Sequence, residues 1–488
     1  MKMTEYRIPE QYYFRIHHVR PRFKGDIENV LIYMAEKIVA IGAKPTKEFV
    51  EKLTDAIYQY PGNQTKKKKT INNWRTEISA LFGFIRHQGE VTAPGSRASE
   101  LAEKQDLVEA FKVFLYNFQY PGNHIKPQEC LECVENGIRF KPAQFILKVL
   151  KEANKGGGNS LGLTKGEICH CIFNDLRVTR GIESPEETWN RIVYNRRRGY
   201  TYDLTGDVIR YAGDIVDYME IANLLKSYDS NMYYLNTLEE ESIIKFIEST
   251  EWFDEYDKLI AENRVTFENV KNLTGAWESY VNRDMSDTDF STDILAYIAT
   301  DQNELDALKD SVVEDIALQE NMVGLEADIQ ARIEDELDVI TTKGIGDIGE
   351  SLVHGHECMR VKLGGRSDLI HLIKRIPTQF AVGYDISSVE LDEKKRYIEV
   401  KTTISSKPLR FNQVHLTRNE WNTADTTREA YYIYRLMISK NERKLFLLND
   451  PVGLYKQDKI SMIPSDGADI TFDPNSVGRY EELLTWQN

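Results

Sequence analysis

The chain has 488 residues and a formal net charge of −15, with 41% hydrophobic and 28% charged side chains. This composition is typical of a globular protein of several domains and excludes the collagen-like and intrinsically disordered classes. No stretch approaches the roughly 18 consecutive apolar residues of a membrane span, and the amino-terminal segment lacks the apolar part of a signal peptide. Five cysteines, a small and odd number, fit a reducing compartment. We therefore expect a cytoplasmic protein.

The charge is distributed unevenly along the chain. Residues 1–100 carry 17 basic and 11 acidic side chains, whereas residues 201–300 carry 7 basic and 21 acidic ones. Because salt screens charges beyond about 10 Å, a locally basic region can attract phosphate in a protein that is acidic as a whole. The net charge thus does not exclude a nucleic acid partner.

Helical periodicity dominates the first part of the chain. Apolar residues recur at three- and four-residue spacing over 27–38, 49–57 and 71–82, which predicts three helices. Two short apolar runs around a Gly-containing turn at 84–95 predict a hairpin. Three helices followed by a hairpin is the order of a winged helix, so we expect a winged-helix-like module within residues 1–140.

A second helical group follows over residues 141–230. Thr164 and Glu167 form a capping-box pattern at the start of one helix, and a long apolar pattern over 207–225 predicts another. We expect a second winged-helix-like module here, which makes the amino-terminal part mainly α-helical.

The next segment, residues 231–340, is acidic and has apolar residues at near-helical spacing. It predicts a helical connector, which is either a dimer-forming segment or a solvated acidic helix packed on a neighbouring domain. Gly344 and Gly346 end this pattern, and residues 341–488 read as an α/β domain. Short β-branched and aromatic runs predict its strands, at 379–391, 396–404, 429–439 and 444–449.

One set of charged residues in this last domain points to chemistry. Asp385 is followed 14 positions later by Glu399, and Lys401 comes two residues after that. Side chains two apart on a strand share a face, so Glu399 and Lys401 point into one site, and a hairpin would bring Asp385 close. Two carboxylates beside an open position suit Mg²⁺, which can activate water and stabilise charge on a phosphodiester. Lys401 can position the water or neutralise the transition state.

This arrangement resembles the PD-(D/E)xK nuclease superfamily, and the run from Gly344 to about Leu448 is similar to its Mrr-like branch, which includes the carboxy-terminal domain of NO VEIN proteins. The shared phrases are IGDIGESLV, VGYDISS, YIEVKTT, FNQVHLTRNEW and YYIYRL. The resemblance implies a nuclease domain in which Asp385 and Glu399 hold Mg²⁺ and Lys401 is catalytic.

The resemblance also assigns two further features. A helix glutamate before the first core strand, here Glu350, is implied as an assisting catalytic residue, and Thr417 with Glu420 fits a helix cap after the Glu-x-Lys strand. The sequence departs from the superfamily label because Tyr384, not proline, precedes Asp385. The other interpretations of the motif are a turn cap plus a surface ion pair, and a nuclease-like fold without activity.

Basic and amide residues of the amino-terminal part are candidates for contact with DNA. Helix residues in a major groove read bases through amide and guanidinium groups, and lysines contact phosphates. A solvated loop is the alternative for each cluster. The candidates are Lys66, Lys67, Lys68, Lys69, Asn72, Asn73, Arg75, Arg196, Arg197 and Arg198.

Other clusters have simpler interpretations. The spacing of His354, His356 and Cys358 on a helix points them around the cylinder, and the remaining cysteines, although enough for zinc, are expected to be buried structural residues. Gln413 either supports the metal site or is polar structure at a strand end.

Taken together, these features predict a restriction-type endodeoxyribonuclease that recognises double-stranded DNA with its amino-terminal half and cuts it with Mg²⁺, a division similar to that of type IIS restriction enzymes. One site cuts one strand, so we expect a homodimer at least during cleavage. A nuclease that requires methylated or hydroxymethylated cytosine, and a DNA-binding regulator or scaffold with an inactive nuclease domain, are the alternatives.

Overall fold

The computed structural model groups the chain into two units. Unit 1 comprises Met1–Glu103 with Leu107–Phe290, and unit 2 comprises Lys104–Asp106 with Ser291–Asn488. No helix among the described residues is long and apolar enough to cross a membrane. The structure describes residues 4–18, 26–60, 71–306, 345–376, 382–406, 412–439, 442–465 and 467–484, except positions 73, 76–77, 79–80, 157–160, 230–231, 286–287, 291, 293, 300–302 and 304.

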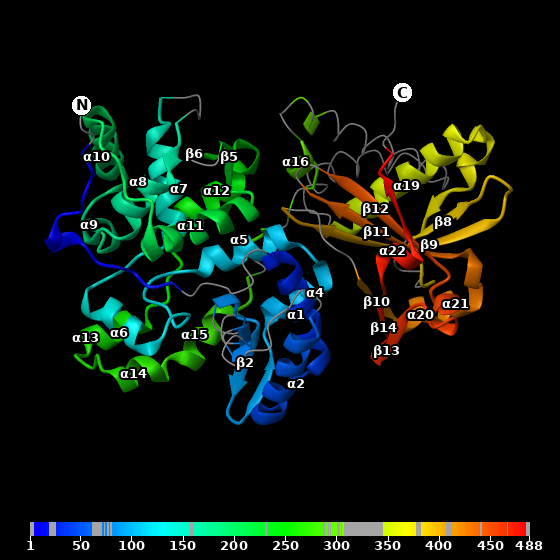
Figure 1. The fold of residues 1–488 in the computed structure, drawn as a ribbon, viewed down its shortest axis with the longest axis horizontal. Helices are drawn as coiled ribbons and strands as arrows, with labels where there is room; N and C mark the ends of the chain where they lie inside the picture. Colours follow the sequence, from blue (N-terminus) through cyan, green and yellow to red (C-terminus); the bar gives the residue numbers. More distant parts are fainter. Residues whose placement is uncertain are drawn as a thin grey trace, which may run out of the picture. The chain divides into compact units, whose positions relative to one another are not determined.

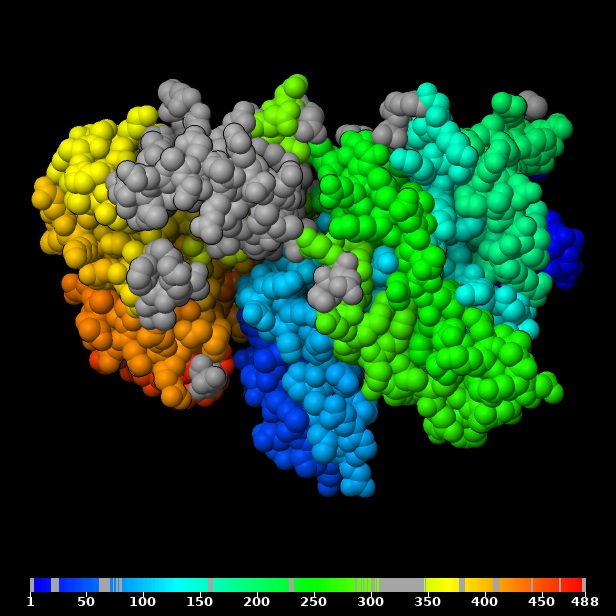
Figure 2. Space-filling model, turned by 180° about the vertical axis from the view of Figure 1, so that it is seen from behind, coloured from blue at the N-terminus to red at the C-terminus, as the bar shows by residue number. Residues whose placement is uncertain are grey.

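Unit 1 begins with a small group of helices and strands, blue and light blue in Figures 1 and 2. The helices α1 and α2 pack together through apolar stripes that include Met34 and Leu53, both fully buried. The described residues between 71 and 82 are helical, as predicted. The strands form a sheet of order β1-β3-β2. The bounds are α1 (Ile27–Ile41), β1 (Lys44–Pro45), α2 (Thr46–Gln59), β2 (Ile85–Gln88), β3 (Val91–Pro94) and α4 (Ser96–Lys104).

A second group in unit 1 repeats this sheet order as β4-β6-β5. Thr164 and Glu167 form the predicted capping box. The following ICHCIF segment is a π-helical turn, because both the backbone N–H and the side-chain amide of Asn174 donate to the carbonyl of Cys169. The bounds are α5 (Leu107–Asn117), α6 (Pro127–Glu135), α7 (Pro142–Ala153), β4 (Leu163–Thr164), α8 (Lys165–Glu167), η3 (Ile168–Phe173), α9 (Leu176–Thr179), α10 (Pro185–Arg198), α11 (Gly206–Ile221), β5 (Leu225–Asp229) and β6 (Met232–Leu235).

The first part of the predicted acidic connector is packed into unit 1. β6 is the central strand of its sheet, and α12 packs on α7. A buried ion pair joins Lys112 Nζ to Glu239 Oε2 at 2.7 Å. Residues 307–340 of the predicted connector lie outside the described residues. The helices are α12 (Glu240–Glu248), α13 (Glu255–Ala261), α14 (Phe267–Asn272) and α15 (Thr274–Val281) in unit 1, and α16 (Ile294–Ile298) in unit 2.

Unit 2 is an α/β structure built on a six-stranded sheet of order β15-β12-β11-β9-β8-β7. The central strands β9 and β11 are parallel, and each other neighbouring pair is antiparallel. Helix α19 packs on β9 (Figure 1). The bounds are α19 (Ile345–Leu363), β7 (Lys374–Arg375), β8 (Ile386–Val389), β9 (Lys395–Ile404), β11 (Tyr431–Ile438), β12 (Arg443–Asn449) and β15 (Arg479–Glu482).

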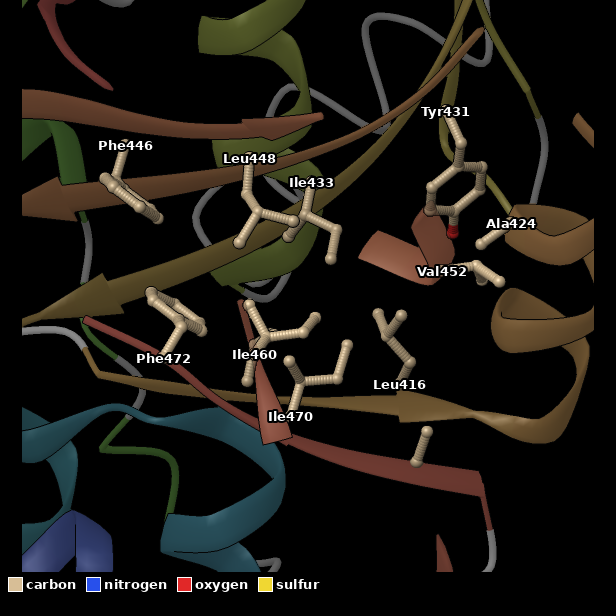
Figure 3. Close-up of a cluster of buried hydrophobic side chains, with 12 residues drawn as sticks. Leu416, Ala424, Tyr431, Ile433, Phe446, Leu448, Val452, Ile460, Ile470 and Phe472 are labelled. Carbon is tan, nitrogen blue, oxygen red and sulfur yellow. The ribbon is translucent and has the colours of Figure 1, made fainter. Parts of the chain in front are cut away.

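A second sheet of unit 2 has the order β10-β14-β13 and packs through an apolar core against the larger sheet. Figure 3 shows Leu416 and Ile470 on one side of this core and Ile433 and Leu448 on the other. Helix α20 contributes Ala424 to the same core. The bounds are β10 (Gln413–Thr417), α20 (Arg418–Thr427), α21 (Pro451–Lys456), β13 (Ser461–Ser465), β14 (Gly467–Thr471) and α22 (Pro474–Val477).

Candidate active site

The β8–β9 hairpin brings Asp385 next to the strand that carries Glu399 and Lys401. The backbone N–H of Asp385 donates to the carbonyl of Ile398 at 2.9 Å, and the N–H of Val400 donates to Asp385 Oδ2 at 2.7 Å. Because side chains alternate along β9, Glu399 and Lys401 project from one face of the sheet. The three residues that the sequence singles out therefore lie together.

Lys401 contacts two carboxylates in this site. Its Nζ lies 2.6 Å from Glu399 Oε1 and 3.1 Å from Glu420 Oε2. Glu399 is almost fully buried, with 5% of its side chain exposed, while the Lys401 side chain is 28% exposed. Lys401 is thus the more exposed partner of this contact.

Burial controls the protonation of these groups. It raises the pKa of Asp385 and of Glu399 above the ordinary carboxyl values, because water is removed from the charged form. Lys401 opposes this shift at both carboxyls. At Lys401 itself burial favours the neutral amine, but Glu399 and then Glu420 outweigh it and raise the pKa of the amine. A cation bound at these carboxyls would favour their charged form, as Lys401 does.

The donor set fits a hard divalent cation. Asp385 Oδ1 and Glu399 Oε2 are the carboxylate oxygens that the contacts with Val400 and Lys401 do not use. Mg²⁺ binds to proteins through one or two carboxylates and keeps several other positions for water and phosphate oxygens. Among the described residues there is no group of three or more His, Cys, Asp or Glu side chains that could form an all-protein metal cage.

Glu350 lies on α19 and forms an ion pair with Arg375, whose Nη2 is 3.0 Å from Glu350 Oε2. Arg375 Nη1 also donates to Ser351 Oγ at 2.8 Å. Arg375 lowers the pKa of Asp385 as one of several smaller influences, which places this guanidinium in the electrostatic neighbourhood of the site. Arg375 is a residue that the sequence analysis missed.

A glycine permits α19 to lie close to β9. A Cβ atom at Gly349 would overlap Thr402 Oγ1 and would lie 2.8 Å from Thr402 Cβ. Thr402 alternates with Lys401 along the strand, so α19 covers the sheet face opposite to Glu399 and Lys401. The glycine in IGDIGESLV therefore sets the distance between the helix and the strand of the site.

The loop before Asp385 is held by α20 and β11. Gly383 has a φ of +78°, and a Cβ atom there would lie 2.6 Å from Thr423 Oγ1 and 2.8 Å from the carbonyl oxygen of Asn419. Tyr431 donates its hydroxyl hydrogen to the carbonyl of Gly383 at 3.0 Å. Only glycine allows this backbone conformation together with so close an approach. The backbone that precedes Asp385 is therefore held in one conformation.

The predicted DNA-contacting residues are spread over two places in unit 1. Lys66, Lys67, Lys68, Lys69 and Asn73 lie outside the described residues. Asn72 and Arg75 lie on the helix at 71–82, where Arg75 Nη1 donates to Thr54 Oγ1 at 3.2 Å.

The arginine cluster lies in the last turn of α10, not in a loop. Arg196, Arg197 and Arg198 are all exposed, and Arg196 is also held by Glu167, with Nε 2.6 Å from Oε1. The Arg198 guanidinium lies 5.3 Å from the ring centre of Tyr194. The contact with Glu167 gives Arg196 a structural role within unit 1.

The histidines and cysteines do not converge on a metal in the part of the chain that is described. His354 Nε2 lies 3.7 Å from Cys358 Sγ, while His356 Nδ1 accepts a hydrogen bond from the backbone N–H of Leu484. All five cysteines are buried and free, and burial was predicted for Cys130, Cys133, Cys169 and Cys171. Gln413 begins β10, and its carbonyl oxygen lies 3.4 Å from Arg435 Nη1.

Glu420 was predicted only as a helix cap. It does form the capping box with Thr417, but its carboxylate also contacts Lys401. The contact joins residues 19 positions apart on different elements, so no local pattern could reveal it.

Comparison with known proteins gives separate matches for the two parts of the chain. Residues 6–278 match the family model described as the amino-terminal part of restriction endonuclease BpuJI, and residues 349–448 match the model of the carboxy-terminal part of protein NO VEIN. No curated protein matches the chain. A solved structure entitled "Crystal structure of pyrene- and phenanthrene-modified DNA in complex with the BpuJ1 endonuclease binding domain" is 26% identical, with a TM-score of 0.50 over 56% of this chain and 99% of that chain.

Proposed function

Since the chain belongs to the restriction endonuclease BpuJI amino-terminal family through residues 6–278, we propose that it is a restriction-type endodeoxyribonuclease. Unit 1 would recognise double-stranded DNA, and unit 2 would hydrolyse phosphodiester bonds with Mg²⁺. The observation that carries the proposal is the meeting of Asp385, Glu399 and Lys401 in one largely buried site. This site lies within the region that matches the NO VEIN model.

The recognition part of the proposal rests on element order and on the similar solved structure. The order α1, β1, α2, the described helical residues between 71 and 82 and the β2–β3 hairpin, with a sheet of order β1-β3-β2, supports a winged-helix-like arrangement. The similar BpuJ1 binding domain is described in its title as bound to DNA. We therefore propose winged-helix-like DNA reading, with the helix at 71–82 as the element that enters a groove.

The catalytic part follows from the PD-(D/E)xK-like arrangement. Asp385 and Glu399 would hold Mg²⁺, which supplies positive charge to stabilise the phosphate as water attacks. Lys401 would donate hydrogen bonds from Nζ to the attacking water or to a phosphate oxygen, and it carries charge opposite to that of the transition state. Arg375 would hold Glu350 in place at the start of α19.

The described residues hold one such site, which would cut one strand at a time. Double-strand cleavage therefore implies two copies of the chain on the DNA. We propose a homodimer at least during cleavage.

Digestion of paired unmodified and cytosine-modified phage DNAs by the purified protein tests this function. We expect discrete fragments with Mg²⁺ and none with EDTA, and sequencing of the ends gives the cut position. The Lys401→Ala variant should bind DNA like the wild type and lose cleavage by at least about 100-fold, because it lacks the cation that opposes transition-state charge. Cleavage that persists in this variant would refute the assignment, and DNA binding without any cleavage by the wild type would favour a regulator or scaffold.

A further inference from the structure

We propose that Glu420 is a positioning residue of the active site, which holds Lys401 so that Glu399 is available to a divalent cation. The proposal rests on the nuclease function proposed above and extends it to a residue outside the Asp385, Glu399 and Lys401 set. It starts from the contact of Glu420 Oε2 with Lys401 Nζ at 3.1 Å.

The need for a second carboxylate follows from the chemistry of Glu399. In the structure Glu399 Oε1 is bound to Lys401 at 2.6 Å, so a cation on Glu399 Oε2 would share the charge of this carboxylate with the lysine. The contact that holds the Lys401 ammonium would then be weaker, which is unfavourable for a partly buried charge. Glu420 supplies the other partner, and its side chain is only 14% exposed.

Glu420 is fixed in this position by the start of α20. The backbone N–H of Thr417 donates to Glu420 Oε2 at 3.1 Å, and the N–H of Glu420 donates to Thr417 Oγ1 at 3.4 Å. Ala424, one turn further along α20, is fully buried in the core shown in Figure 3. The helix is therefore anchored to the sheet that carries Lys401, and the carboxylate cannot move away without breaking the cap.

The simpler explanation is that Glu420 only caps the helix and its contact with Lys401 has no consequence. The two roles can be separated by substitution. Glu420→Gln keeps an oxygen that can accept from the Thr417 N–H, since capping boxes use Glu or Gln, but it removes the charge that holds Lys401. Thr417→Ala does the opposite, because it removes the hydroxyl of the cap and leaves Glu420 charged.

The test compares the wild type, Glu420→Gln and Thr417→Ala in the full-length protein. Mn²⁺ binding is followed by the electron paramagnetic resonance signal of free Mn²⁺, and single-turnover DNA cleavage is measured over a range of Mg²⁺ concentrations. Thermal unfolding and DNA affinity are measured in parallel. We expect Glu420→Gln to weaken Mn²⁺ binding, and to raise the Mg²⁺ concentration for half-maximal cleavage, by about 10- to 100-fold. Its unfolding temperature and DNA affinity should stay near the wild-type values.

Thr417→Ala should lower the unfolding temperature and leave the Mn²⁺ affinity unchanged. Wild-type Mn²⁺ affinity and Mg²⁺ dependence in Glu420→Gln would overturn the proposal and leave Glu420 as a cap. Equal loss of metal affinity in both variants would also overturn it, because the effect would then come from the helix. A wild type that neither binds Mn²⁺ nor cuts DNA would instead refute the nuclease function itself, so the two failures are distinguishable.

Discussion

Single residues of unit 2 gain their importance from partners that lie far away in the sequence. Arg375 is the clearest example, because it holds Glu350 and Ser351 on α19 while it stands on the short edge strand β7. Only 20% of the Arg375 side chain and 17% of the Glu350 side chain are exposed. A largely buried carboxylate that loses its cation is destabilised, so the position of Glu350 depends on this arginine.

We predict that Arg375→Ala lowers the rate of DNA cleavage by about 10- to 100-fold, because Glu350 loses the group that orients it. DNA affinity should not change. The matched control is Arg366→Ala, since Arg366 forms exposed ion pairs with Asp368 and Glu393. Single-turnover cleavage and a DNA-binding titration check both variants, and equal rates for the two would contradict the prediction.

At the scale of elements, the packing of α19 on β9 fixes the position of the strand that carries Glu399 and Lys401. The helix lies on the sheet face opposite to these two side chains. Gly349 and Thr402 meet with no room for another atom, and the contact lies one residue from Glu350 on the helix and one residue from Lys401 on the strand. A shift of the helix therefore moves two predicted site residues relative to each other. Glycine at 349 serves the close approach of helix and strand.

Gly349→Ala should destabilise the protein by about 1–3 kcal/mol, as expected for overpacking, and should reduce cleavage. Thermal unfolding and cleavage assays measure the two effects. The double variant Gly349→Ala with Thr402→Ala should recover part of the lost stability, because the overlapping hydroxyl is removed. Gly346, where a Cβ atom would meet nothing within 4 Å, is the control position for glycine replacement on the same helix.

The cross-strand pair of His415 on β10 and Asp469 on β14 makes a pH-dependent contribution to the stability of the protein. His415 Nδ1 lies 2.9 Å from Asp469 Oδ1, and this hydrogen bond raises the pKa of His415. Burial and the charge of Lys401 lower this pKa, whereas the charge of Glu420 raises it further. A histidine with a raised folded-state pKa contributes stability that is fully present below its unfolded pKa of about 6.5 and is lost as pH rises through the folded value.

We predict that Asp469→Asn lowers the stability of the protein more at pH 5.5 than at pH 8.5. Because the His415 side chain is 44% exposed, the difference should be below about 1 kcal/mol and should shrink in high salt. Denaturant unfolding at the two pH values measures it, and NMR titration should show a lower pKa for His415 in the variant. A pH-independent loss of stability would show that the pair is not charged.

At the scale of the whole molecule, the order of units along the chain differs from the order of the predicted domains. The segment Lys104–Asp106 belongs to unit 2, although it comprises the last residue of α4 and the two residues before α5. Gln105 Oε1 accepts hydrogen bonds from Thr403 Oγ1 at 2.8 Å and Arg435 Nη2 at 2.7 Å. Asp106 forms a β-bridge with Ile404 at the end of the site strand.

Asp106→Ala should destabilise unit 2 by about 1–3 kcal/mol, because the buried Asp106 carboxylate accepts from both the N–H and the hydroxyl of Thr292. The exposed Asp392→Ala serves as the control and should change stability by less than about 0.5 kcal/mol. Differential scanning calorimetry follows the unfolding of both variants. Equal effects would mean that Asp106 contributes nothing beyond a surface carboxylate.

The sequence predicts correctly those structural features that depend on a local pattern of residues. The alternation in YIEVKTT predicts a strand with Glu399 and Lys401 on one face, and the Thr417 and Glu420 spacing predicts a helix cap, both as found. Arg375, the second contact of Glu420 and the Lys104–Asp106 segment were missed, because each depends on which elements pack together. The acidic composition of residues 232–281 likewise gave no sign that many of their apolar side chains are buried in unit 1.

The three-residue segment has a consequence for protein engineering. The chain passes between the units at three points, after residues 103, 106 and 290, so a single junction cannot separate them. A chimaera that joins a foreign recognition region to Ser291–Asn488 would leave Thr403, Arg435 and Thr292 without the groups that Gln105 and Asp106 supply. A hybrid that keeps unit 2 intact therefore requires a graft that retains Lys104–Asp106 together with Ser291–Asn488.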